Sequence, residues 1–182
     1  MEESFFETTD IAKRLAEYKA PRYEELGEFD VYMEQLVCIL DKHLHEFLIP
    51  GEEKALTSSM INNYVQKKII EAPKRKKYSK DQIIKLMVIG VLKQVLPISE
   101  ISEIIELSME QYPLDIAYNY FCGELENALQ STFQTRSFSQ IAERKVNKKT
   151  VLSENVRSAV LAFANRIYVK KNLYYNRVKK EV

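Results

Sequence analysis

Amide side chains follow one side of the segment from residue 58 to residue 68. Wound as an α-helix of about 3.6 residues per turn, this segment has an apolar side and a polar face, and the polar face consists of Ser59, Asn62, Asn63, Gln66 and Lys67. Asn and Gln can form two hydrogen bonds with the N6/N7 edge of adenine, so amides on a short helix are suited to reading bases in the major groove. The spacing alone supports an ordinary solvent-exposed helix face equally well.

Four consecutive basic residues, Lys74 to Lys77, follow this segment. Because Pro73 precedes them and another helical pattern follows, we expect an exposed loop or hairpin over residues 71–78. A positive tip held near a helix can contact DNA phosphates and release counterions. The alternatives are a solubilising loop, in which Tyr78 only returns the chain to the core, and, more weakly, a localisation signal.

Other kinds of site lack their sequence signals. The four glycines are isolated, so the chain has no glycine-rich loop of the kind that holds nucleotide phosphates. Cys38 and Cys122 lack zinc-ligand or redox spacing, and we expect both to be reduced and buried. His43 is expected to be a partly buried packing residue; it lies two positions from His45 on a helix, so the two cannot share a metal ion. No carboxylate pair stands out as an acid and base. We therefore expect no enzyme activity, no metal and no cofactor.

The net charge of +1 conceals a strong segregation of charge along the chain. Basic and acidic side chains number 6 and 14 in residues 1–56, 9 and 2 in 57–93, 1 and 7 in 94–142, and 11 and 3 in 143–182. The acidic beginning and the basic end could pair within one chain or across a two-fold dimer. A homodimer would place two DNA-reading helices on successive half-sites.

The two ends of the chain carry weaker signals. Tyr174 and Tyr175 lie beside several cations and could stack on nucleic acid, although a solvated helix end is the commoner case. The start of the chain does not resemble a signal peptide, and no window reaches the roughly 18 apolar residues of a membrane span. We therefore expect a cytoplasmic protein that does not bind a membrane.

Hydrophobic spacing predicts helices almost everywhere, so the expected fold class is all-α. In the first part of the chain, Asp10 is expected to cap a short helix, and a longer helix should run from Phe29 to Phe47. Apolar residues at helical spacing in this longer helix, with Phe29 and Tyr32 among them, form a stripe that must pack against another part of the chain. Thr57 or Ser58 should cap the helix that carries the amides.

The second part of the chain has clear helix starts and stops. Ser79 and Gln82 form a capping-box pattern before a helix that is apolar on nearly all sides and must lie in a core. Pro97 should end that helix, and Ser99 should cap the next. A further helix follows Pro113.

The last part of the chain begins with a polar link over residues 134–150. A final helix follows, which Ser153 could cap and in which a heptad seam is possible but incomplete.

The stretch from residue 59 to residue 70, followed by Pro73-Lys-Arg, Tyr78-Ser and Ile98-Ser-Glu-Ile101, resembles the MerR-type winged helix-turn-helix. A closer resemblance is to a bacterial family of domains of unknown function, family 1836, which is similar to this MerR-like core. It lies in the sequence of residues 56–65, Leu-Thr-Ser-Ser-Met-Ile-Asn-Asn-Tyr-Val. The resemblance to that family spans most of residues 5–150. It implies three regions: N-terminal helices over 1–55, the winged helix-turn-helix over 56–107, and a C-terminal helical region over 108–182.

The resemblance also implies roles for individual residues. It places Ile61 at a core position, Tyr64 at a phosphate-facing position and Arg75 in the wing. With the basic loop, the residues expected to contact phosphate are Tyr64, Lys68, Lys74, Arg75, Lys76, Lys77 and Tyr78. The chain departs from the MerR pattern at Asn62, where Arg is usual, at Asn63, where Tyr is frequent, and at Lys68, where a Gly usually starts the wing.

These patterns predict a DNA-binding transcriptional regulator that acts on double-stranded DNA as a homodimer, with its effector unknown. The alternative is a non-enzymatic protein-interaction module built on a winged-helix core, which the near-zero net charge and the missing Arg at position 62 favour. A weaker third possibility is RNA binding or effector sensing by the C-terminal helices.

Overall fold

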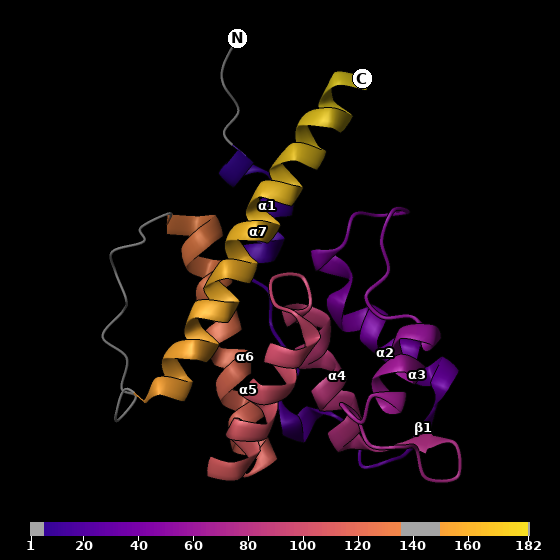
Figure 1. Cartoon of the computed structure of the whole chain (residues 1–182). Coiled ribbons are helices and arrows are strands. Elements are labelled where there is room, and N and C mark those ends of the chain that lie inside the picture. Colours follow the sequence, from indigo (N-terminus) through magenta and orange to yellow (C-terminus); the bar gives the residue numbers. More distant parts are fainter. Residues whose placement is uncertain (1–5, 136–149, 182) are drawn as a thin grey trace. The chain divides into compact units, whose positions relative to one another are not determined.

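The computed structural model describes residues 6–135 and 150–181, so residues 136–149 of the expected polar link lie outside it (Figure 1). The chain divides into two compact units. Residues 21–121 form the central unit, and the described residues before and after them form the terminal unit. The boundaries expected between the three sequence regions, near residues 55 and 107, both fall inside the central unit.

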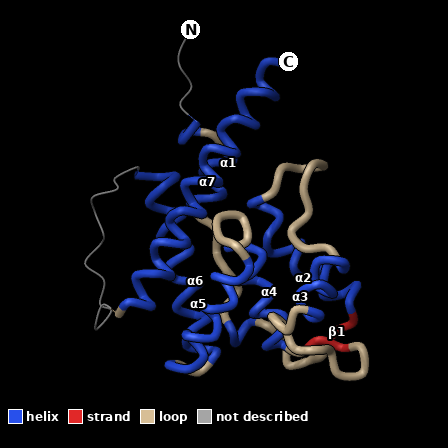
Figure 2. Tube along the Cα trace, viewed as in Figure 1, coloured by secondary structure: helices blue, strands red, loops and turns tan. Residues whose placement is uncertain are grey.

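The all-α prediction is confirmed: the described residues form seven α-helices and a single two-stranded sheet (Figure 2). The central unit contains η2 (Tyr23–Glu25), β1 (Val31–Tyr32), α2 (Met33–Leu44), η3 (His45–Phe47), α3 (Ser58–Gln66), β2 (Lys77–Tyr78), α4 (Lys80–Leu92), α5 (Ile98–Gln111) and the first part of α6 (Leu114–Gln130).

Helix α4 is the centre of this unit, as its apolar sequence predicts. Eleven of its residues are buried, including Lys80 and Lys85. At Gly90 helix α2 comes very close, since a Cβ atom there would lie 2.4 Å from Cδ1 of Leu44. The absence of a side chain at Gly90 therefore allows the two helices to pack together.

The helix predicted from Phe29 to Phe47 is shorter than expected. Helix α2 begins at Met33, because Val31 and Tyr32 form β1 and pair antiparallel with β2. Phe29 and Tyr32, expected on the buried stripe, are 62% and 49% exposed. The helical spacing of these apolar residues did not reveal that Tyr32 pairs with a distant segment.

The caps of the central unit follow the sequence in two of three cases. Thr57 caps α3, and its Oγ1 accepts from the Met60 N–H at 3.3 Å. Ser79 caps α4, and the side chain of Gln82 accepts from the Ser79 N–H at 2.8 Å. The prediction that Ser99 caps the next helix is wrong, because α5 already begins at Ile98, with Pro97 as its N-cap.

The terminal unit contains η1 (Phe6–Thr8), α1 (Asp10–Ala16), the end of α6, the π-helical turn η4 (Ser131–Thr135) and α7 (Val151–Glu181). Its core includes the aromatic rings of Phe6, Phe133 and Tyr168, which meet at centroid distances of 5.4–6.3 Å. The tip of Tyr168 hydrogen-bonds the carboxylate of Glu7. This cluster brings the start and the end of the chain into one core.

Both caps in the terminal unit lie before the expected residues, by one position at α1 and by three at α7. Thr9, not Asp10, caps α1 and accepts from the Ala12 N–H. Thr150, not Ser153, precedes α7, and these two residues exchange hydrogen bonds from each backbone N–H to the other side chain. This reciprocal pattern is a capping box with Ser153 at its third helical position.

Candidate nucleic-acid interface

Helix α3 exposes the polar face that its sequence predicts. Ile61 is fully buried and fixes the opposite side of the helix. All five residues predicted on that face are exposed: Ser59, Asn62, Asn63, Gln66 and Lys67. Within the described chain, the amide groups of Asn62, Asn63 and Gln66 take part in no side-chain hydrogen bond, so they are available to an external partner.

The end of α3 turns sharply at Lys68. This residue has a φ of 59°, the left-handed conformation that commonly ends a helix. The Ile69 N–H then donates to the Tyr64 carbonyl at 2.9 Å, and Ile70 is buried at 1% exposure. Lys68, which stands where the sequence resemblance predicts a Gly, therefore takes the left-handed conformation that Gly adopts most readily, and it is exposed.

The segment after α3 is held on α4 through Glu71. Its carboxylate pairs with the ammonium of the buried Lys85, and its carbonyl accepts from the side-chain amide of Gln82 at 2.7 Å. Because Gln82 also belongs to the capping box of α4, one side chain joins this segment to the start of the helix. The chain entering the basic loop is thereby fixed to the core.

The basic loop is a tight hairpin turn. The Lys77 N–H donates to the Lys74 carbonyl at 2.9 Å, and the two residues between them, Arg75 and Lys76, have φ values of 50° and 64°. Positive φ at both central residues is what a type I′ turn requires. Of the two possibilities that the sequence left open, the structure forms the hairpin.

The cations of this turn differ from the two buried lysines of α4 in having no acidic partner in the described chain. Lys80 pairs with Glu28 at 2.6 Å, and Lys85 pairs with Glu71. In the described part of the chain, none of the four turn cations forms an ion pair, and those of residues 74–76 are exposed. The turn is therefore a concentrated positive charge that the central unit does not neutralise.

The family of the central unit follows from its sequence. The family model of a domain of unknown function, DUF1836, matches residues 21–121. The chain belongs to this family. The match coincides with the central unit and lies inside the span of 5–150 expected from the sequence. No curated protein and no solved structure matches the chain.

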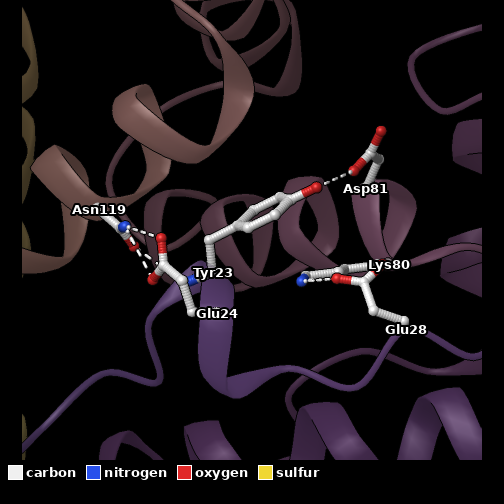
Figure 3. A network of polar contacts seen from close by, with 6 residues as sticks. All are labelled: Tyr23, Glu24, Glu28, Lys80, Asp81 and Asn119. Carbon is white, nitrogen blue, oxygen red and sulfur yellow. Dashed lines mark hydrogen bonds and ion pairs between the residues drawn. The ribbon is translucent and has the colours of Figure 1, made fainter.

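The DUF1836 domain holds the segment before β1 through a polar network at the start of α4 (Figure 3). The Lys80 ammonium lies 3.9 Å from the ring centre of Tyr23, and the Tyr23 hydroxyl donates to Asp81 at 3.3 Å. The Tyr23 N–H donates to the Asn119 side chain at 2.9 Å, and this side chain also bonds Glu24. Since α4 begins directly after β2, these contacts hold the segment that leads into β1 at the helix end next to its partner strand.

Two tyrosines that were expected at phosphates pack inside the DUF1836 domain. Tyr64 is 7% exposed and Tyr78 is 2% exposed, and burial raises the pKa of both phenols. Tyr78 faces Val31 across the two-stranded sheet, where Val31 is also buried. Their burial favours the packing role that the sequence offered for Tyr78 as the alternative.

Tyr32 lies beside the basic turn at the surface, and the sequence did not predict it as a site residue. It faces Lys77 in the sheet, and the Lys77 ammonium lies 5.1 Å from the centre of its ring. Helical spacing had placed Tyr32 on a buried stripe, so no signal in the sequence connected it with the basic loop. The exposed surface of this part of the domain therefore contains an aromatic ring as well as cations.

The remaining candidate groups lie outside this interface. His43 is half-buried as expected, and its pKa is lowered by burial and by the neighbouring charge of Lys42. The prediction that both cysteines are buried is wrong for Cys38, which is exposed, and correct for Cys122. Among the described residues, no cluster of three His, Cys, Asp or Glu side chains is placed to hold a metal ion, and no helix could cross a membrane.

Proposed function

We propose that the DUF1836 domain is a MerR-like winged helix-turn-helix that binds double-stranded DNA in a transcriptional regulator. Helix α3 is its recognition helix, and the turn at residues 74–77 is its wing. The amides of Asn62, Asn63 and Gln66, with Ser59 and Lys67, read base edges in the major groove. Lys68 and the four turn cations contact phosphates.

The observation that carries this proposal is the turn of four cations without acidic partners in the described chain, held on the same domain as an exposed amide face. Amides are suited to base readout, and lysine and arginine to phosphate contact. A solubilising loop needs neither a fixed backbone nor an anchor in the core. Here the loop is closed by a backbone hydrogen bond and preceded by the Glu71–Lys85 ion pair.

The regulator is proposed to act in the cytoplasm of a bacterium as a homodimer, because two-fold DNA sites need two recognition helices at a fixed spacing. The experiment that tests the function is retention of genomic duplex fragments by the purified protein at two salt concentrations, followed by sequencing. Enrichment of a short motif with two-fold symmetry is the expected result. Retention without a motif, or no retention, would contradict sequence-specific regulation.

A second candidate function is protein interaction, and helix α5 favours it. Only Ile101 of this helix is buried, and its acidic residues are accompanied by Leu107 and Met109, which are 36% and 44% exposed. No Lys or Arg occurs between residues 94 and 121. An acidic surface with exposed apolar side chains suits a basic protein partner. Copurification of a basic partner that is lost with Leu107→Ser, with no retention of DNA, would favour this function.

A further inference from the structure

We propose that Tyr32 and Lys77 form one phosphate subsite, in which the tyrosine ring positions the lysine ammonium for a contact with the nucleic-acid backbone. The inference rests on the proposed DNA-binding function and adds to it a residue from strand β1. Tyr32 is a positioning residue, and Lys77 provides the charge.

The geometry places the ring and the ammonium together. Tyr32 and Lys77 are opposite each other in the antiparallel pair, and the ammonium lies 5.1 Å from the ring centre. That distance is within the range in which the negative face of an aromatic ring attracts a cation. In the described part of the chain no carboxylate pairs with Lys77, so the ring is its partner and leaves its charge uncompensated.

The backbone under both side chains is fixed. The Tyr32 N–H donates to the side chain of Gln35 at 3.0 Å, which ties the end of β1 to the start of α2. The adjacent pair, Val31 and Tyr78, is buried. On the other side, the Lys77 N–H closes the turn. Tyr32 is nevertheless 49% exposed, so the pair lies at the surface.

A held lysine binds a phosphate better than a free one. An exposed lysine side chain loses much of its rotational freedom when it contacts a phosphate. Where the ring already restricts the ammonium, part of that loss has occurred before binding, and the affinity rises through preorganisation. The ring carries no charge, so it should change the affinity without changing how many phosphates are neutralised.

A double-mutant cycle on the full chain tests this subsite. The probe is a fluorescein-labelled duplex of mixed sequence, and its anisotropy gives the Kd over a series of salt concentrations. We expect Lys77→Gln to lower the slope of log K against log salt by about one unit. Tyr32→Leu should weaken binding about two- to fivefold with the slope unchanged. Tyr32→Phe, which keeps the ring, should bind like the wild type.

The coupling between the two residues is the decisive measurement. In the Lys77→Gln background, Tyr32→Leu should have no further effect, since the ring then has no ammonium to position. Tyr112→Leu is the matched control, because Tyr112 is 42% exposed on the same domain but lies after α5. If Tyr32→Leu loses its fold in thermal unfolding, Tyr32→Thr, which retains a strand-forming residue, replaces it.

Three results would overturn the inference. An equal effect of Tyr32→Leu with and without Lys77 would show that the ring does not act through the ammonium. An unchanged Kd for Tyr32→Leu, while the turn cations set the salt slope, would remove Tyr32 from the interface and leave DNA binding intact. A wild-type protein that binds no duplex at any salt would overturn both this inference and the proposed function.

Discussion

The backbone N–H of Lys77 donates to the carbonyl of Lys74 at 2.9 Å and closes a turn whose two central residues are both cations in the left-handed conformation. Gly, Asn and Asp are the residues usually found at these positions. A left-handed residue with a side chain costs about 1–2 kcal/mol relative to the right-handed conformation. Arg75 and Lys76 are therefore residues that weaken the turn while adding positive charge to it.

Removal of the turn cations should change the salt dependence of DNA binding. In the variant with Lys74, Arg75, Lys76 and Lys77 all changed to Ala, we expect the slope of log K against log salt to flatten by up to about 3–4 units, because each neutralised phosphate contributes nearly one unit. Fluorescence anisotropy over a salt series measures it. A control with Lys13→Ala and Lys42→Ala removes exposed cations from other helices. An unchanged slope in the turn variant would show that the wing assignment is wrong.

Removal of the amides should change sequence preference instead of salt dependence. We expect Asn62→Ala, Asn63→Ala and Gln66→Ala each to reduce discrimination between target and mixed-sequence duplex by about 1–3 kcal/mol if the side chain reads a base. The target is the motif enriched from genomic fragments. Because these side chains are exposed and neutral, the unfolding temperature and the salt slope should change little. If all three variants discriminate between target and mixed-sequence duplex as well as the wild type does, α3 is not the recognition helix.

Replacing the two left-handed cations of the turn with residues that favour this conformation should stabilise the protein and weaken its binding to DNA. Arg75→Asn with Lys76→Gly introduces the Asn-Gly pair that type I′ turns prefer. The free energy of unfolding should rise by about 1 kcal/mol, since the gain at two left-handed residues exceeds the entropy that Gly adds to the unfolded chain. In the same variant, the slope of log K against log salt for DNA binding should flatten by about two units, because two cations are removed.

The matched control for that variant is Arg75→Ala with Lys76→Ala. It removes the same two charges and keeps side chains at the left-handed positions, so it should lose the same salt slope without any gain in stability. Urea unfolding distinguishes the two variants. Equal stability of both would mean that the turn carries no conformational cost.

The Glu71–Lys85 pair should make stability depend on pH in acid. Burial alone would raise the pKa of Glu71, but the hydrogen bond and charge of Lys85, with a backbone hydrogen bond, lower it below the ordinary value of 4.5. The folded protein thus binds this proton less tightly than the unfolded chain does. The stabilisation is present above pH 4.5 and is lost as the pH falls through the lower folded pKa.

Glu71→Gln should therefore be less stable than the wild type near neutral pH, and the difference should shrink as the pH falls below 4.5. We expect at most about 1 kcal/mol from the ion pair itself, because the carboxylate is solvent-accessible. Urea unfolding at several pH values measures the difference. In a Lys85→Met background, Glu71→Gln should have little effect at any pH, and a persistent pH-dependent difference there would assign the effect to another group.

Local rules predicted the parts of the fold that depend on neighbours in the sequence. The Ser79–Gln82 capping box and the burial of α4 follow from spacings within one helix, and the structure confirms them. Errors arose where two candidate caps lie close together, as with Thr9 and Asp10, because backbone geometry decides which side chain meets the free N–H. Helix ends depend on such competition more than helix interiors do.

The sequence by itself determined the all-helical class, the amide face of α3 and the positive charge of the loop, because these depend on residue type and on spacing within one segment. Only the tertiary structure decided that Tyr32 leaves the predicted helix to face Lys77, that Tyr64 and Tyr78 are buried, and that Arg75 and Lys76 form a left-handed turn. The physical reason is that β pairing and burial depend on which distant segments meet. Residues 31–32 and 77–78 are joined by hydrogen bonds that no local periodicity encodes.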